Sequence, residues 1–231
     1  MELCKSCHAG CCRRYNPVIW GSDIIRICEA LNVDIFFILS VIKVDKEKAK
    51  QLENIEPIFI FTDTGEELYF ELTLKYEESK YFPGSSKCMF LREWNAKELG
   101  SEELSGIISR CSIYSIRPIN CRAWPVGYDA QRDQVILKDP HLVFEKEHKR
   151  VNESPAYSLC SRELKHEDYM MNEETMAQNA IINHYEMEFF IKLAHKWNQN
   201  PDVSDNFYKF LVKEYNNRIE YIKGEAVNGA M

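Results

Sequence analysis

Eight of the nine cysteines in this chain occupy positions from which they could bind a metal. Four of them lie within the first twelve residues, and the other four are spread over the rest of the chain. The eight residues are Cys4, Cys7, Cys11, Cys12, Cys88, Cys111, Cys121 and Cys160. Thiolates are soft ligands, so several that converge from distant segments indicate a soft metal ion, an iron–sulfur cluster or a set of disulfides.

The N-terminal cysteines have the spacing of a metal-binding turn. Two residues separate Cys4 from Cys7, which lets one turn present two sulfur atoms to one metal centre. Gly10 permits a tight turn before Cys11 and Cys12. Because the side chains of adjacent residues diverge, we expect Cys11 and Cys12 to serve different atoms. They could bind two irons of one cluster or metals in two separate sites, or one could be a ligand and the other a thiol beside the site.

A second group of residues surrounds Pro118. Proline fixes its own φ and favours an extended Arg117, so we expect a rigid loop rather than a helix between Cys111 and Cys121. A rigid loop can hold a pair of ligands in place. Arg117 and Arg122 could neutralise an anionic thiolate cluster, bind an anionic substrate, or pair with the surplus carboxylates of the chain.

The surrounding sequence predicts the roles of four further residues. Cys88 is predicted to reach the site from a strand or a loop. Cys160 stays among the predicted ligands, although no residue near it has ligand spacing. Tyr114 could line a substrate pocket, or it could belong to the core. Cys28 lies on the apolar face of the first predicted helix and is expected to be a core thiol.

The charge balance argues against nucleic acid or an anionic membrane as a partner. The chain has 29 basic and 36 acidic residues, a net charge of −7, and no stripe of Lys and Arg. Its longest apolar stretch, residues 35–44, is too short to cross a membrane, and we see no signal peptide. We therefore expect a cytoplasmic protein, in which thiols stay reduced and an odd number of cysteines fits disulfides poorly.

The hydrophobic pattern predicts an α+β fold, with a small mixed α/β cysteine-rich metal-binding core and a C-terminal antiparallel helical hairpin. We expect the metal-binding domain over residues 1–162, the hairpin packed on it over 163–223, and a disordered tail over 224–231. Strands are predicted over residues 58–61, 68–74 and 135–137. Helices are predicted over residues 23–31, 35–42, 104–110, 173–197 and 205–222, with Ser22 and Ser204 as N-caps.

The motifs together resemble a known family. The patterns Cys-x2-Cys-x3-Cys-Cys, Cys-x-Phe-Leu and Cys-x-Ile-Tyr-x2-Arg-Pro-x2-Cys-Arg follow one another in this chain. Their order and spacing resemble the CxxCxxCC cysteine-cluster family, which is described as a zinc- or iron-chelating domain. Its best-described relatives are flagellin lysine N-methylases, which the family links to an iron–sulfur cluster and S-adenosylmethionine. The residues at its motif positions are Cys4, Cys7, Cys11, Cys12, Cys88, Cys111, Arg117, Pro118, Cys121 and Arg122.

Two classes of function follow from these residues. The first is an iron–sulfur protein, with a 4Fe–4S cluster favoured by the adjacent Cys11 and Cys12. The resemblance implies that such a protein could be a lysine N-methylase, in which Arg117 and Arg122 would hold the carboxylate of S-adenosylmethionine. The second is a zinc-stabilised structural or protein-interaction module without catalysis, and a metal carrier is a third, weaker option. We expect a protein partner or protein substrate, and the sequence identifies no catalytic residue.

Overall fold

The computed structural model describes residues 9–14, 18–64, 68–99, 106–137 and 173–228. The chain divides into two compact units, each assembled from two distant stretches: Met1–Pro17 with Leu74–His184, and Val18–Thr73 with Tyr185–Met231. The predicted domain boundary near residue 162 lies outside the described residues. None of the described helices is both long and apolar enough to cross a membrane.

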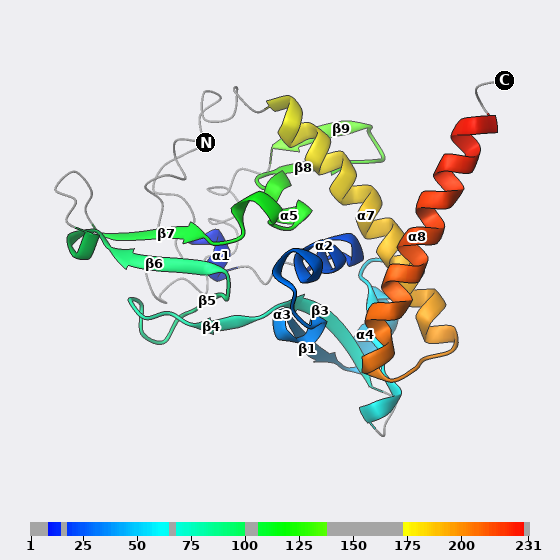
Figure 1. The fold of residues 1–231 in the computed structure, drawn as a ribbon, viewed down its shortest axis with the longest axis horizontal. Coiled ribbons are helices and arrows are strands. Elements are labelled where there is room, and N and C mark those ends of the chain that lie inside the picture. The colour runs from blue at the N-terminus through cyan, green and yellow to red at the C-terminus, as the bar shows by residue number, and fades with distance from the viewer. Residues whose placement is uncertain (1–8, 15–17, 65–67, 100–105, 138–172, 229–231) are drawn as a thin grey trace. The chain divides into compact units, whose positions relative to one another are not determined.

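The first unit is built from short antiparallel hairpins (Figure 1). Three strand pairs form them: β4 (Tyr76–Glu78) with β5 (Ser86–Cys88), β6 (Leu91–Asn95) with β7 (Ile107–Cys111), and β8 (Val126–Asp129) with β9 (Gln134–Leu137). The helical segments are α1 (Cys11–Arg14), η3 (Ala96–Leu99), η4 (Tyr114–Ile116) and α5 (Ile119–Ala123), together with the first part of α7 (Glu173–Gln199). The α1 turn packs against β5.

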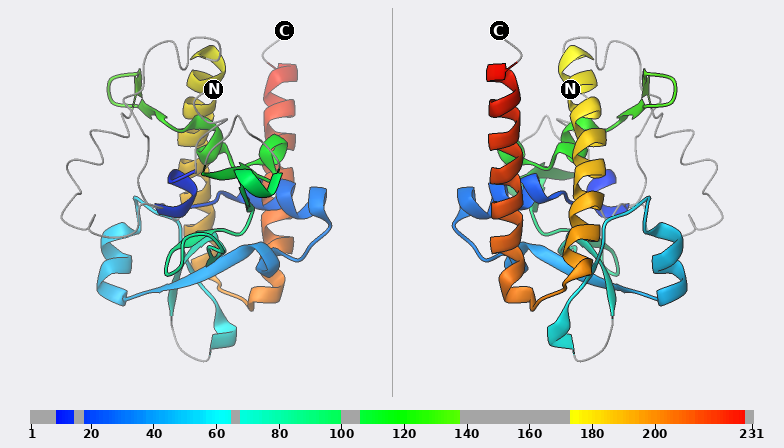
Figure 2. Two further views of the ribbon diagram at one scale, coloured as in Figure 1. Left: turned by 90° about the vertical axis from the view of Figure 1, so that its left-hand side faces the viewer. Right: turned by 90° about the vertical axis from the view of Figure 1, so that its right-hand side faces the viewer.

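The second unit combines a three-stranded sheet with helices. Strand β3 (Tyr69–Leu74) lies between β1 (Leu39–Val44) and β2 (Ile58–Ile60), with Phe59 opposite Phe70. The helical segments are α2 (Gly21–Leu31), α3 (Ile35–Ile38), α4 (Lys46–Leu52), η2 (Thr62–Thr64), the second part of α7, and α8 (Ser204–Asn228). In Figure 2, α8 runs beside this part of α7. The predicted mixed fold with small sheets and a C-terminal helical pair is confirmed.

An aromatic cluster forms the core of this second unit. The ring of Phe59 lies 5.1 Å from that of Phe190 on α7 and 4.8 Å from that of Phe207 on α8, measured between centroids. All three side chains are fully buried. The Trp197 Nε1–H donates to the Ile60 carbonyl at 2.6 Å, which ties the end of α7 to β2. Tilted and edge-to-face aromatic contacts of this kind add to the gain from burying apolar area, so the cluster fixes the helical pair on the sheet.

The helix predicted over residues 35–42 is wrong beyond its first turn. Asn32 takes the left-handed conformation that ends α2, and the Asp34 carboxylate accepts from the Phe36 N–H at the start of α3. From Leu39 the chain continues as strand β1 in the sheet with β3. Val41 and Ile42 are β-branched, and pairing in the sheet outweighs their helical spacing.

Three other local predictions are also corrected. Residues 107–110, predicted as helix, form strand β7, because they pair along their whole length with β6. Ser22 does not cap α2, whose N-cap is Trp20; the Ser22 hydroxyl instead donates to Glu186 at 2.6 Å. Helix α8 continues through Gly224 to Asn228. The strands predicted over 58–61, 68–74 and 135–137 are confirmed within one residue at each end.

Gly21 provides a test of how closely the helices of the second unit pack. A Cβ atom at this position would lie 2.5 Å from a ring carbon of Tyr215 and 3.0 Å from one of Phe190. We expect Gly21→Ala to lower the free energy of unfolding by about 1–3 kcal/mol, because the rings cannot both move away. Gly224→Ala is the matched control, since nothing lies within 4 Å of its Cβ position. It should be neutral or slightly stabilising in urea denaturation, and equal effects of the two variants would contradict the packing.

Cys28 lies in the core of the second unit, as predicted, with 4 % of its surface exposed. Burial, with smaller contributions from Asp34 and Glu29, raises its pKa from 9.0 to about 11. The folded protein therefore holds this proton more tightly than the unfolded chain does. The stability that Cys28 contributes is fully present below about pH 9 and is lost as the pH rises to about 11, by roughly 2–3 kcal/mol.

This pH dependence can be isolated with Cys28→Ala. The difference in unfolding free energy between wild type and variant, measured by urea denaturation under reducing conditions, should shrink by roughly 2–3 kcal/mol between pH 8 and pH 11. Ionisation of the other cysteines and of the tyrosines affects both proteins equally and cancels in the difference. A difference that stays constant over this range would contradict the assignment.

Candidate metal centre

Four segments of the first unit carry the described cysteines that are candidate ligands. The α1 turn carries Cys11 and Cys12, β5 ends at Cys88, β7 ends at Cys111, and α5 carries Cys121. The turn into α1 is closed by a hydrogen bond from the Cys12 N–H to the Ala9 carbonyl, 2.9 Å. Ala9, with φ of 60°, takes the left-handed conformation here, so this residue makes the turn for which the sequence pointed to Gly10.

Hydrogen bonds between the hairpins set the positions of Cys88 and Cys111. Cys88 is directly opposite Tyr76 in the β4–β5 pair, and Cys111 is opposite Leu91 in the β6–β7 pair. The Phe90 carbonyl accepts from both the N–H and the hydroxyl of Ser112, at 2.8 and 3.0 Å. Because Phe90 and Ser112 adjoin these strand ends, the bonds hold the ends of β5 and β7 together.

The thiols from all four segments share one electrostatic environment. Burial is the main cause that raises the pKa of the Tyr76 phenol, and four cysteines raise it further: Cys88, Cys12, Cys121 and Cys11. Cys88 in turn interacts with Cys111. The five predicted ligands that fall within the described residues thus all lie in one unit.

The surroundings of Cys11, Cys88 and Cys111 keep these three thiols protonated at neutral pH. Burial raises the pKa of Cys88 to about 11 and also raises that of Cys111, on which Arg117 acts in the opposite direction. The pKa of Cys11 is raised well above its usual 9.0, first by a hydrogen bond with Cys12 and then by burial. A metal that binds these sulfur atoms must therefore displace their protons.

A complete metal-binding core is not shown by the structure. Among the described residues, no three His, Cys, Asp or Glu side chains are grouped so that they could hold a metal ion. Cys4, Cys7 and Cys160, three of the eight predicted ligands, lie outside the described residues. The six described cysteines are free thiols, so none of them forms a disulfide.

Arg13 fixes the position of the α1 turn and was not singled out from the sequence. Its side chain is 1 % exposed, and its guanidinium donates to Glu93 at 2.5 Å, to the Ser79 hydroxyl at 3.1 Å and to the Ser109 hydroxyl at 3.2 Å. It also lies over the Phe82 ring, 4.7 Å from the centroid. Through Arg13, the chain just after Cys12 is therefore held to β6, to β7 and to the residue that follows β4. An arginine directly after paired cysteines was the signal available in the sequence.

Lys87 is the second buried cation of this unit. Its ammonium group donates to Glu77 at 2.5 Å and to the Leu91 carbonyl at 2.6 Å, and it lies 3.7 Å from Glu93. Glu93 is therefore shared between Lys87 and Arg13, and its side chain is 3 % exposed. Buried charges persist only when they are paired in this way, which makes the network a fixed frame for the neighbouring Cys12 and Cys88.

The predicted substrate-binding residues, Tyr114, Arg117 and Arg122, lie in the segment from Cys111 to Arg122. Arg117 is extended, as predicted, and its guanidinium lies 4.1 Å from the centroid of the Tyr114 ring. Tyr114 is 59 % exposed, so it does not belong to the core. The rigid loop predicted up to Cys121 is wrong for its second half: Pro118 caps helix α5, which carries both Cys121 and Arg122. Proline restricts the residue before it and leaves the following residues free to form a helix.

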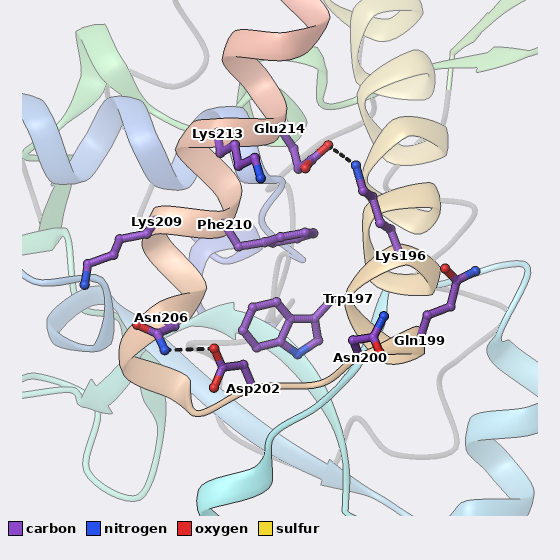
Figure 3. Close-up of a pocket in the computed structure, with 10 residues that line it drawn as sticks. All are labelled: Lys196, Trp197, Gln199, Asn200, Asp202, Asn206, Lys209, Phe210, Lys213 and Glu214. Carbon is purple, nitrogen blue, oxygen red and sulfur yellow. Dashed lines mark hydrogen bonds and ion pairs between the residues drawn. The ribbon is translucent and has the colours of Figure 1, made fainter.

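A pocket with different chemistry occurs in the second unit, where α7 connects to α8 (Figure 3). It has a volume of about 450 Å³. The rings of Trp197 and Phe210 lie 5.0 Å apart at its base, and Lys196 pairs with Glu214 at 2.6 Å on its wall. The residues that line it are all described and include no cysteine. The pocket therefore offers no thiolate ligand to a metal.

Comparison with known proteins adds no assignment. No protein-family model, curated protein or solved structure matches this chain. The resemblance to the cysteine-cluster family stays a prediction that rests on the motifs.

The Arg13–Glu93 pair can be tested by removing one charge and then both. We expect Arg13→Met to lower the free energy of unfolding by about 3 kcal/mol, because the buried Glu93 carboxylate would keep only the Ser79 hydroxyl at 2.8 Å and the more distant Lys87 among its described partners. Arg13→Met combined with Glu93→Leu should recover part of this loss. Arg92→Met, at the exposed neighbouring position of β6, is the control and should be nearly neutral in urea denaturation. A loss of less than 1 kcal/mol in Arg13→Met would contradict the role given to the pair.

Proposed function

We propose that this chain is a cytoplasmic, cysteine-ligated metalloprotein that binds an iron–sulfur cluster. The observation that carries the proposal is that the α1 turn, with Cys11 and Cys12, packs against β5, which ends at Cys88, in the same unit as Cys111 and Cys121. Such a set of thiols fits a soft metal in kind, because thiolates bind zinc and iron–sulfur clusters in preference to hard cations. Neutral thiols also avoid an uncompensated buried charge in the metal-free chain.

The ligands would come from the eight cysteines singled out by the sequence. Five are positioned by the described part of the first unit: Cys11, Cys12, Cys88, Cys111 and Cys121. Cys4, Cys7 and Cys160 complete the proposed set. When bound, a four-iron cluster supplies electron transfer, or, where one iron lacks a protein ligand, a position for binding substrate. The chain's own contribution is to hold the sulfur atoms in a fixed, buried place.

Adjacent thiols favour a cluster over a single zinc ion. The neighbouring Cys12 raises the pKa of Cys11 well above its usual 9.0, so two thiolates at these positions are unfavourable on their own. Once both are deprotonated, the two negative charges must be neutralised by separate metal atoms or by one metal and a neighbouring donor. A zinc-stabilised structural or interaction module is the alternative, and it differs from the first proposal in metal content.

If the protein is an enzyme, the activity that fits the motifs is an iron–sulfur-dependent methyltransferase acting on protein lysine, with S-adenosylmethionine as the methyl donor. Arg117, held over Tyr114 and close enough to Cys111 to affect its pKa, is the proposed binding group for the donor's carboxylate. Arg122, next to Cys121 on α5, is proposed to assist it. A protein substrate or protein partner is part of this proposal.

Metal content after anaerobic purification tests the proposal. Wild type should contain iron and acid-labile sulfide in near-equal amounts and show a broad visible absorption. Cys121→Ser should lose most of the metal and some stability, whereas Cys28→Ser, the matched control in the other unit, should keep the metal. Stoichiometric zinc without sulfide would support the zinc alternative instead. Intact metal in Cys121→Ser and a second ligand variant, Cys88→Ser, would contradict the ligand set.

Metal affinity should rise with pH, because each bound sulfur must first lose a proton. The raised pKa values of Cys88 and Cys111 mean that this loss occurs on metal binding throughout the range from pH 6.5 to pH 8. We expect the apparent affinity for Zn²⁺ to increase by about tenfold per pH unit for each proton displaced. Competition with a chelator of known pH dependence measures this slope. An affinity independent of pH would show that the thiols are not the ligands.

A further inference from the structure

The pocket where α7 connects to α8 has an aromatic base (Figure 3). Its volume of about 450 Å³ falls within the range of small-molecule sites, roughly 300–1,000 Å³. Trp197 is almost fully buried, whereas the Phe210 ring, 5.0 Å away, keeps part of its surface accessible. The base of the pocket therefore offers a flat apolar surface, and Phe210 supplies most of it.

Both carboxylates that line the pocket already have partners. Glu214 accepts a hydrogen bond from the Lys196 ammonium group at 2.6 Å. Asp202 accepts one from the side-chain amide of Asn206 at 2.8 Å and another from the Val203 N–H, also at 2.8 Å. These bonds occupy the negative groups of the lining, so the pocket has little to offer a cation.

The two remaining cations of the lining are in a different position. In the part of the chain that the structure describes, the exposed Lys209 and Lys213 make no hydrogen bond or ion pair with another residue. They are four residues apart and so lie on the same side of α8. In Figure 3, Lys213 and Phe210 both point into the pocket, and Lys209 extends at its rim.

The charge of the lining differs in sign from that of the whole chain. Three lysines line the pocket against one aspartate and one glutamate, which leaves a charge of +1. The chain as a whole carries −7. A concave site with an excess of positive charge raises the local concentration of anions, so the field in this pocket favours an anionic ligand.

We propose that this pocket binds a small, flat apolar molecule that carries one negatively charged group, of the class of aromatic carboxylates. The flat body would lie against Phe210, and Lys213, assisted by Lys209, would bind the carboxylate. Both parts of the ligand are needed, because an ion pair exposed to water gains little by itself. The inference does not depend on the proposed metal centre, whose described cysteines belong to the other unit.

The test is a titration of the ¹⁵N-labelled full chain with 2-naphthoate, followed by NMR. The Trp197 Nε1–H, which donates to the Ile60 carbonyl, gives a resonance at the base of the pocket, and Trp197→Phe assigns it. A second titration uses 2-naphthamide, which has the same flat body without the charge. Comparison of the two ligands separates the contribution of the lysines from that of the aromatic surface.

Two double variants with equal loss of charge complete the design. Lys209→Gln with Lys213→Gln removes the cations of the pocket. Lys43→Gln with Lys192→Gln is the matched control, because both lysines are exposed residues of the same unit and neither lines the pocket.

We expect 2-naphthoate to shift the Trp197 indole resonance in a saturable way, and the pocket variant to bind it about fivefold more weakly than wild type. The control variant should match wild type, and 2-naphthamide should bind wild type and the pocket variant equally. Equal weakening in both double variants would overturn the inference, as a general effect of charge. Saturation without a shift at Trp197, or no binding at millimolar concentrations, would also overturn it.

Discussion

The buried guanidinium of Arg13 must be neutralised and hydrogen-bonded, and the first unit is arranged so that this happens. Glu93 supplies the opposite charge. The hydroxyl groups of Ser79 and Ser109, which belong to β-hairpin segments far along the chain, accept further hydrogen bonds from Arg13. A buried charge without these partners would cost several kcal/mol, so the contacts form together or not at all. Because Arg13 directly follows Cys12, the ion pair with Glu93 also holds Cys11 and Cys12 beside β5, the strand that carries Cys88.

The short hairpins of the first unit form little hydrophobic core of their own, so other contacts must hold them together. Each pair in the first unit has only three to five residues per strand. Isolated two-stranded hairpins are marginally stable in water, so links between them are needed. The Arg13–Glu93–Lys87 network is one such link, and thiolate bonds to a metal would be a second. In the second unit, by contrast, the aromatic cluster around Phe59 provides an ordinary hydrophobic core.

The sequence predicted those features whose cause is local. The strand predicted over residues 68–74 and the long helix predicted over 173–197 depend on nearby residues, and both were found. Strands β1 and β7 were mistaken for helices because their pairing partners lie elsewhere in the chain. Cysteine spacing identified the candidate ligands, but the role of Arg13 could not be assigned, because it comes from Glu93, far along the chain. The ligand role itself stays a prediction, since the described residues do not group three ligands together.

X-ray absorption at the iron and zinc edges of the anaerobically purified full chain tests the central claim most directly, because it reports the atoms bound to the metal. The account predicts an iron edge, a first shell of sulfur at roughly 2.3 Å, the distance typical of metal–thiolate bonds, and a further shell of iron. A first shell of nitrogen and oxygen, or a protein without bound metal, would contradict the claim that these cysteines form a metal centre.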